Sequence, residues 1–202
     1  MYKLANISTF ESIMNHGVPN PIEIRKVRPE EGEKVKALML SDFYPVLEHD
    51  YPNPPGKDAA LEEFYDPNRL NIGAFDDDNL VGFTDINIGQ IPGQYTCIPA
   101  KVAQTDPEKT ASWFNSVVAK KYRGRGLQRK MYATAQSMLP PEVQYIDVTP
   151  NPGNTPSVRN IEQLGFERIG PFRDVLDKQG VIADPNSTEI NHQDYYLKKL
   201  ER

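Results

Sequence analysis

The sequence predicts an α/β domain of α+β character, in which a mixed β-sheet is flanked by helices. Strand-like and helix-like patterns interleave along the chain, which is typical of a sheet covered by helices. The 202 residues suffice for one sizeable core but not for two full domains. A hydrophobic content of 38% and a charged content of 25% are those of an ordinary globular protein. We therefore expect an N-terminal extension over residues 1–21 and a single domain over residues 22–202.

The first half of the chain predicts one strand, one helix and a hairpin. Residues 22–27 alternate apolar and polar side chains, as a half-buried strand does. Pro29 opens a helical stretch in which Val35, Leu38 and Met39 recur at helix spacing. The remaining expected elements are a short helix over 9–15, a proline-rich loop over 44–57, a short helix over 61–64, and strands over 71–75 and 80–86 that flank a turn at 76–79.

The second half predicts four strands and two helices. After a loop over 89–110, residues 113–119 form a mostly apolar strand. A helix follows, whose inner face carries Leu127, Met131, Ala135 and Met138, and which Pro140 and Pro141 stop. Then come a strand over 145–148, a helix that begins at Thr155 with Val158, Ile161 and Leu164 inside, and strands over 166–169 and 194–200.

Positive charge is concentrated in one window of an acidic chain. The formal net charge is −5, yet no acidic residue occurs between Glu108 and Glu142. That window holds Lys109, Lys120, Lys121, Arg123, Arg125, Arg129 and Lys130. A local cationic block indicates either a site for a small polyanion or a solvated basic face.

The turn Arg123–Gly126 connects the strand at 113–119 to the helix that begins at Leu127. Glycines at a helix entrance let backbone N–H groups approach a phosphate, and the helix N-terminus adds partial positive charge. A tight strand-to-helix turn explains a Gly-x-Gly pair equally well. A dinucleotide fingerprint would need a third glycine where Arg129 stands, and neither a Walker loop nor a Gly-x-Ser-x-Gly elbow occurs.

Two segments together resemble the GNAT superfamily of N-acetyltransferases. Arg123-Gly124-Arg125-Gly126-Leu127-Gln128 is similar to its Arg/Gln-x-x-Gly-x-Gly/Ala motif, except that Gln128 replaces the last small residue. Asn154 to Phe166 resembles the second motif, an Asn-x-x-Ser/Ala helix that ends in Leu-Gly-Phe. The resemblance runs from about Ile22 to Leu200 and implies an acyl-CoA N-acyltransferase fold with splayed central strands.

The resemblance also implies a site for acetyl-CoA between the strands near 113–119 and 144–149. The backbone of Ser116, Val117 and Val118 would pair with the pantetheine arm like an added strand. The diphosphate would be held by the segment Arg123, Gly124, Arg125, Gly126, Leu127, Gln128 and Arg129. Asn154 would contact the pantetheine, or it would simply cap its helix.

Catalytic residues are less evident. Many relatives place a tyrosine where this chain has Ile161, so Ser157, one turn earlier, is the candidate acid near the sulfur; it would otherwise cap the helix. The backbone N–H near Val118 is the oxyanion donor that the resemblance implies. Asp85 and Asp147 are candidate bases or ordinary strand carboxylates. Tyr195 and Tyr196 would line the acceptor pocket or face the core.

These residues predict an N-acetyltransferase that moves an acetyl group from acetyl-CoA directly to a primary amine of a small molecule or a protein N-terminus. The alternative is a CoA-binding regulatory or structural relative without turnover. We expect no metal, because Cys97 and three scattered histidines make no common zinc cluster. We also expect no nucleic-acid or membrane partner, a cytoplasmic location and a possible homodimer, since the chain is acidic and has no apolar run of about 18 residues.

Overall fold

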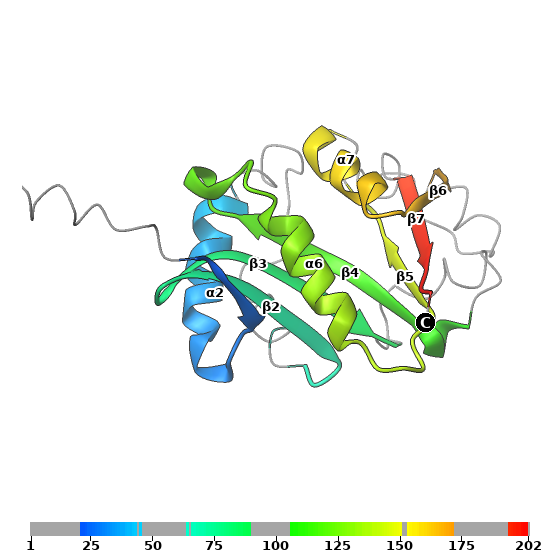
Figure 1. The fold of residues 1–202 in the computed structure, drawn as a ribbon, viewed down its shortest axis with the longest axis horizontal. Helices are drawn as coiled ribbons and strands as arrows, with labels where there is room; N and C mark the ends of the chain where they lie inside the picture. Colours follow the sequence, from blue (N-terminus) through cyan, green and yellow to red (C-terminus); the bar gives the residue numbers. More distant parts are fainter. Residues whose placement is uncertain are drawn as a thin grey trace, which may run out of the picture.

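The computed structural model describes residues 21–43, 45, 64, 66–89, 106–150, 153–171 and 194–201. The described residues contain three α-helices and seven strands in one mixed sheet, which confirms the predicted fold class (Figure 1). The helix predicted over 9–15, most of the loop at 44–57 and most of the loop at 89–110 lie outside the described residues.

The sheet has the order β1-β2-β3-β4-β5-β7-β6. Its first half is an antiparallel meander of β1 (Glu23–Lys26), β2 (Arg69–Asp76), β3 (Asn79–Ile88) and β4 (Thr110–Val118). The predicted hairpin is confirmed, with Asp76 paired to Asn79 across the turn and Asp77 at a φ of 53°. Aspartate tolerates this left-handed conformation better than most residues, because its short side chain bonds locally.

The second half of the sheet is β5 (Tyr145–Val148), β7 (Asp194–Lys199) and β6 (Glu167–Pro171), all at or close to their predicted positions. Only β4 and β5 are parallel; every other neighbouring pair is antiparallel. A parallel pair needs a crossover between its strands. The chain supplies it as α6 (Leu127–Met138), which packs on one face of the sheet (Figure 1).

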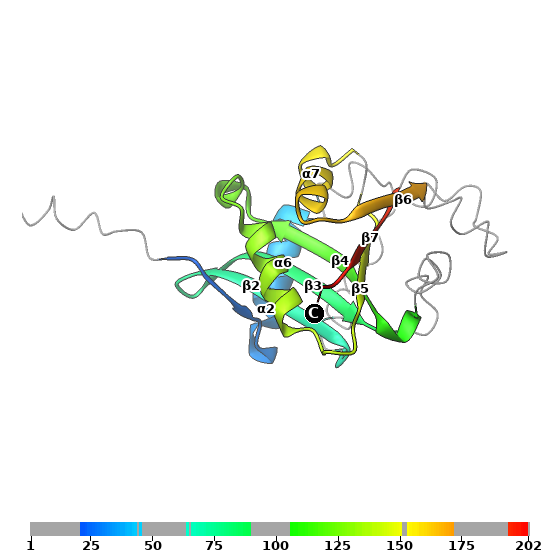
Figure 2. The ribbon, with the colours of Figure 1, turned by 45° about the vertical axis from the view of Figure 1, so that its right-hand side comes forward.

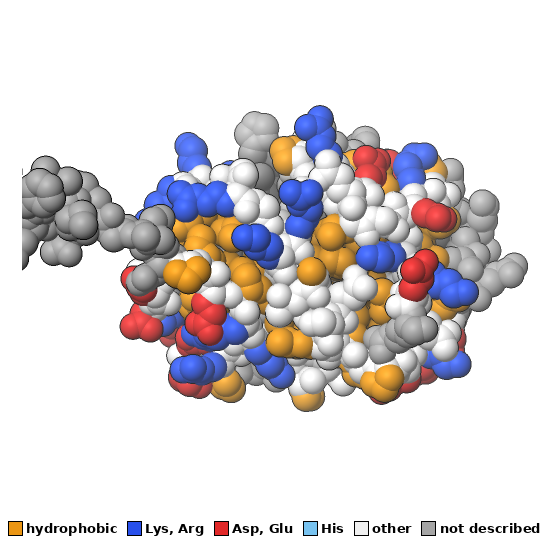
Figure 3. Space-filling model, in the orientation of Figure 1, with side chains coloured by type: hydrophobic (Ala, Val, Ile, Leu, Met, Phe, Trp, Pro, Cys, Tyr) orange, Lys and Arg blue, Asp and Glu red, His pale blue; other side chains and the backbone are white. Residues whose placement is uncertain are grey.

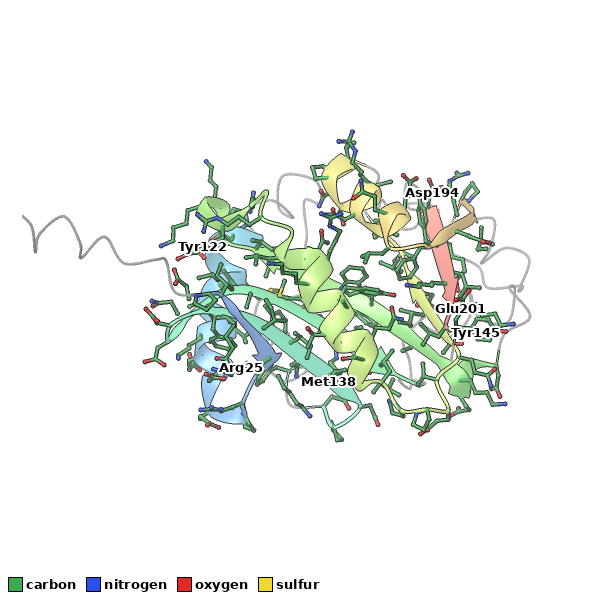
Figure 4. All side chains as sticks on the ribbon, in the orientation of Figure 1. Arg25, Tyr122, Met138, Tyr145, Asp194 and Glu201 are labelled. Carbon is green, nitrogen blue, oxygen red and sulfur yellow. The ribbon has the colours of Figure 1, made fainter. Side chains whose placement is uncertain are left out.

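Helix α6 buries Leu127, Met131, Tyr132 and Ala135 against the larger core cluster. Met138 continues the apolar face that the sequence predicts, but it is 47% exposed at the C-terminal end of the helix (Figure 4). The helix ends there, and the following residue, Leu139, takes the buried position at 6% exposure. Met138 lies 11 residues after Leu127, which at about 100° per residue leaves it within about 20° of the same direction, so its exposure comes from its place at the end of the helix and not from the helical period.

The other face of the sheet carries α2 (Gly32–Leu38), which lies behind it in Figure 1. The chain enters this helix through a 3-10 turn, η1 (Pro29–Glu31), and leaves it through a π-helical turn, η2 (Met39–Phe43). Val35, Leu38 and Met39 are buried as predicted, and they pack with Phe75, Phe83 and Val117 in a second core cluster.

A partly buried ion pair joins β1 to the entrance of α2. The Nη1 and Nη2 atoms of Arg25 donate to the Glu31 carboxylate, at 2.8 and 2.9 Å. The Arg28 N–H donates to the same carboxylate at 2.9 Å. These donors, Arg25 above all, lower the pKa of Glu31 to about 2, so the carboxylate stays ionised although it is buried.

The third helix, α7 (Thr155–Gln163), has one buried residue, Ile161, with Val158 and Leu164 partly buried against the larger cluster. Gly165 ends it at a φ of 82°, the left-handed position that favours glycine. Among the residues that the structure describes, no helix is long and apolar enough to span a membrane.

Candidate functional site

The central feature of the site is the point where β4 and β5 part. They pair through four rungs, from Thr110 with Tyr145 to Trp113 with Val148. Strand β4 then continues to Val118, whereas β5 ends at Val148. Figure 1 shows the two strands meeting near the C-terminus and diverging toward α7. The structure therefore contains the predicted splay.

The register of β3 and β4 decides which backbone groups face the open edge of β4. The N–H of Ala119 donates to the carbonyl of Val81 at 2.9 Å, so this antiparallel pair is hydrogen-bonded. Hydrogen-bonded and non-bonded pairs alternate. The backbone groups of Ser116 and Val118 therefore point to the open edge, while those of Val117 point to β3. In agreement, the Val118 carbonyl accepts a bond from Arg123 Nε at 2.9 Å.

A side-chain oxygen at this edge also lacks a partner. Ser116 Oγ is buried and makes no hydrogen bond with any residue in the described part of the chain. Leaving a buried hydroxyl unpaired costs about 1–3 kcal/mol, so a position of this kind requires an explanation. A ligand with polar groups that lies along β4 would supply one.

A β-bulge interrupts β4 beside the point of divergence. Thr84 pairs with Ser116 and Ile86 pairs with Trp113, so two β4 residues, Phe114 and Asn115, stand opposite Asp85 alone. The Asn115 N–H donates to Asp85 Oδ1 at 2.9 Å. Bulges redirect side chains and strand edges, and they are over-represented next to active sites.

The glycine turn stands at the far end of β4. After a 3-10 turn, η5 (Lys120–Tyr122), Gly124 and Gly126 adopt φ angles of 77° and 70°. Gly126 is the N-cap of α6 and no side chain caps the helix. A Cβ on Gly124 would have no heavy atom within 4 Å, so the backbone conformation, not crowding, requires glycine there.

A hollow of about 620 Å³ opens at this turn, lined by Gly124, Arg125, Gly126, Arg129, Lys130 and Ala133. Figure 3 shows Lys and Arg side chains gathered over this end of α6. Uncapped helix N–H groups, left-handed glycines and exposed cations together form a good binding site for a phosphate group.

The predicted basic residues have different surroundings. Arg123 stabilises the turn, because its Nε donates to the Val118 carbonyl and its Nη2 lies 3.6 Å from Asp42 Oδ1. Arg129 donates to Gln163 on α7 at 2.9 Å. Arg125 stays exposed, with its guanidinium 5.0 Å from the centre of the Tyr122 ring. Arg125 and Arg129 line the hollow, whereas Arg123 is not among its lining residues.

Polar side chains join α6 to α7, which lie next to each other in both ribbon views (Figures 1 and 2). Gln128 accepts from Asn160 Nδ2 at 2.6 Å, and its own Nε2 stands 3.5 Å from Ser157 Oγ. Gln128 thus acts through its side chain, a role that the sequence did not predict. Asn154 accepts from the Ser157 N–H at 3.2 Å and so caps α7, one of the two roles left open for it.

The sheet face opposite α6 carries a set of buried polar residues. They alternate with core residues along four strands, and they are Arg69, Asn71, Asp85, Asn87, Ser112 and Asp147. Arg69 and Asp85 form an ion pair, each with only 2% of its side chain exposed. Of this set, only the two aspartates were predicted as candidate bases from the sequence. The alternation of Asp85 and Asn87 with Ile86 and Ile88 is the signal that indicates the rest of the set.

Asp147 differs from Asp85 in its partners. The Tyr195 hydroxyl donates to Asp147 Oδ2 at 3.3 Å, and the Ser112 hydroxyl also hydrogen bonds this carboxyl. Burial raises the pKa of Asp147 to about 7, and the two hydrogen bonds only partly oppose that effect. Tyr196, by contrast, lies in the core on the α6 side, and so does Ile161.

Within the described residues, no group of three or more His, Cys, Asp or Glu side chains is placed to hold a metal ion.

Solved structures with the same fold are acetyltransferases. The PaiA N-acetyltransferase of Thermoplasma acidophilum, in complex with coenzyme A, has a TM-score of 0.57 and 14% identity over 89% of this chain and 99% of its own. The Escherichia coli ribosomal-protein-S18-alanine N-acetyltransferase has a TM-score of 0.55 and 13% identity over 89% and 93%. The Paenibacillus lautus diaminobutyrate acetyltransferase, in complex with L-2,4-diaminobutyric acid and coenzyme A, has a TM-score of 0.56 and 14% identity over 88% and 93%.

At these identities the likeness shows the fold alone, and no curated protein sequence matches the chain. The family comparison goes further, because the model of the acetyltransferase (GNAT) family matches residues 35–166. This match spans β2 to β5 and both motif segments. The chain belongs to the GNAT acetyltransferase family and is an acyltransferase.

Proposed function

We propose that this enzyme transfers the acetyl group of acetyl-CoA directly to a primary amine of a small molecule or a protein N-terminus. The observation that carries the proposal is the open edge of β4, which ends at the uncapped glycine turn of α6. An extended, amide-containing arm with a diphosphate at one end fits both parts of this site.

The described residues fit acetyl-CoA at three places. The backbone groups of Ser116 and Val118, with Val117 between them, would pair with the pantetheine amides, and the unpartnered Ser116 Oγ lies beside them. The N–H groups of Gly124 to Gln128 would hold the diphosphate, supported by Arg125 and Arg129. Asn154 would contact the pantetheine only through the part of its side chain that does not cap α7.

Transfer from a thioester to an amine requires three events: the amine loses a proton, the oxyanion is stabilised, and the thiolate leaves. The Val118 N–H points to the open edge and so is available to an oxyanion. Holding both reactants in line can supply about 7–11 kcal/mol. The Ser157 hydroxyl, in the first turn of α7, is the candidate proton donor to the thiolate.

An assay with acetyl-CoA and a panel of amines, in which the released free thiol is measured, identifies the class of acceptor. Peptides with free N-termini, diamines and amino sugars cover the two kinds of acceptor. We expect thiol release with at least one class, together with an acetylated product by mass spectrometry. Tight CoA binding without thiol release for any amine would instead support the alternative, a relative without turnover, for which Gln128 and Ile161 are the sequence observations.

A further inference from the structure

One buried carboxylate on the face opposite α6 has no cationic partner among the described residues. Asp147 is 4% exposed, and within the described part of the chain its polar contacts are with Ser112 and Tyr195. Its neighbours Ile146 and Val148 belong to the core on the α6 side, so its own side chain lies on the other face. An unpaired buried carboxylate destabilises a fold, which points to a functional role.

Asp147 stands next to the point where β4 and β5 diverge. It pairs with Ser112, and the next rung, Trp113 with Val148, is the last of the ladder. Phe114 lies on the same face, two residues beyond Ser112 and therefore about 7 Å farther along the strand. It is 37% exposed, so a molecule that comes from this face can reach the divergence at Phe114.

We propose that Asp147 is the proton acceptor for the amino group of the substrate, which reaches the divergence from the face opposite α6. This inference rests on the proposed function, because it requires acetyl-CoA between the diverging strands. Ser112 and Tyr195 act as positioning residues that hold the carboxyl through their hydroxyl groups.

The step balances in protons and electrons. The Asp147 carboxylate takes one proton from the substrate ammonium, which leaves a neutral amine and a carboxylic acid. The amine lone pair forms the C–N bond, the C–S bond breaks, and its electron pair leaves with the thiolate. Ser157 gives its proton to the thiolate, the second nitrogen proton replaces it on Ser157, and Asp147 returns its own proton to solvent.

The groups around Asp147 permit a titration near neutral pH. Ser112 faces it from β4, Tyr195 and Lys199 lie on its side of β7, and Tyr145 precedes it on β5. Farther along the face, Arg69 is bound to Asp85 and does not neutralise Asp147. Burial raises the pKa of Asp147 to about 7, so a large fraction of the enzyme carries the basic form at neutral pH.

The test compares Asp147→Asn with the native enzyme, using the responsive amine from the panel. We expect kcat/KM to fall by about 100-fold or more, because a positioned base contributes about 10²–10⁴-fold. In the native enzyme kcat/KM should fall as the pH drops below about 7, and we call this fall the acidic limb. We expect the acidic limb to be absent in the variant. The melting temperature at pH 8 should rise, since the unpaired buried charge is removed.

Asp106→Asn is the matched control. Asp106 is exposed before the start of β4, and its Oδ1 accepts the Glu108 N–H, which asparagine can also do. This variant should keep the activity, the acidic limb and the melting temperature.

The outcomes separate the two proposals. A native enzyme that acetylates no amine overturns the proposed function and this inference with it. An active native enzyme whose Asp147→Asn variant keeps the acidic limb overturns the inference alone, even if turnover falls, because a structural role leaves the limb in place. If Asp147→Asn fails to bind CoA, Tyr195→Phe is tested in its place. This variant loses the hydroxyl that donates to the Asp147 carboxylate, so the acidic limb must move to higher pH. A limb that does not move overturns the inference.

Discussion

At the scale of single residues, the glycine turn is defined by backbone conformation. Gly124 and Gly126 both have φ near 70–77°, and non-glycine residues adopt this region only with strain of about 1 kcal/mol. The space beside Gly124 is open. A small side chain there is therefore tolerated sterically, whereas a negatively charged one would oppose a diphosphate.

Gly124→Glu should weaken CoA binding by about 100-fold or more, and Gly124→Ala by much less. Both variants carry the same backbone strain, so the difference between them reports the added charge and bulk. Calorimetric titration with CoA measures the affinities, and circular dichroism checks the fold. Equal affinities for the two variants would show that the diphosphate does not bind at this turn.

The Ser157 hydroxyl is the candidate proton donor to the thiolate. Its oxygen accepts from Gln128 Nε2 at 3.5 Å, which leaves its own proton for donation. Ser157→Ala should lower kcat by roughly tenfold or more while the CoA affinity stays within about twofold. Ser137→Ala, on the exposed side of α6, is the matched control. If Ser157→Ala retains the native kcat, Ser157 has no part in the transfer.

At the scale of elements, polar side chains connect helices that the core alone would leave loosely attached. Only Ile161 of α7 is fully buried, and Gln128 and Arg129 of α6 reach Asn160, Ser157 and Gln163 on it. The departure of Gln128 from the family motif thus has a structural reason. A small residue at this position would remove the contacts with Asn160 and Ser157 and leave only that of Arg129 with Gln163.

Gln128→Ala should lower the free energy of unfolding by about 1–2 kcal/mol, because it removes one short hydrogen bond and one long one, both partly buried. Arg129→Ala removes a single exposed bond and should change stability by less than about 0.5 kcal/mol. Urea denaturation of both variants gives the comparison. A Gln128→Ala variant as stable as the native protein would mean that the bridge does not hold α7.

At the scale of the whole molecule, two buried carboxylates with opposite pKa shifts shape the pH dependence of stability. The pKa of Glu31 falls from 4.5 to about 2 on folding, so its contribution is present above pH 4.5 and is lost as the pH falls toward 2. The pKa of Asp147 rises from 3.8 to about 7, so its contribution is present below pH 3.8 and is lost as the pH rises through 7.

Stability should therefore peak near pH 4, between the unfolded-state pKa values of 3.8 and 4.5, and decline on both sides, by at most about 1.4 kcal/mol per pH unit for each group. Glu31→Gln should remove the acid side of this curve and Asp147→Asn the neutral side. Denaturant unfolding between pH 3 and pH 8 measures both. A native protein that is more stable at pH 8 than at pH 5, and that Asp147→Asn leaves unchanged, would contradict the raised pKa of Asp147.

Much of the fold was predictable from local patterns. The alternation at 22–27, the hairpin around Asp77 and the helix of Leu127, Met131 and Ala135 depend on neighbouring residues, and all three are confirmed. The exposure of Met138 was not predictable in this way. Helical periodicity gives the direction in which a side chain points, but not whether the core extends to the end of the helix. The contacts of Gln128 with Asn160 and of Arg69 with Asp85 could not be predicted from local patterns either, because the partners are 16 or more residues apart in the chain.

Residues close together in the chain were enough to indicate the family and to predict a cofactor site: a glycine turn, an acid-free window and two motif segments. The place where β4 parts from β5, the backbone groups that face that edge and the buried carboxylate that has a cation beside it follow from the tertiary structure. They depend on strand register, because a shift of one residue between strands would turn Asp147, Ser112 and Asp85 to the other face of the sheet.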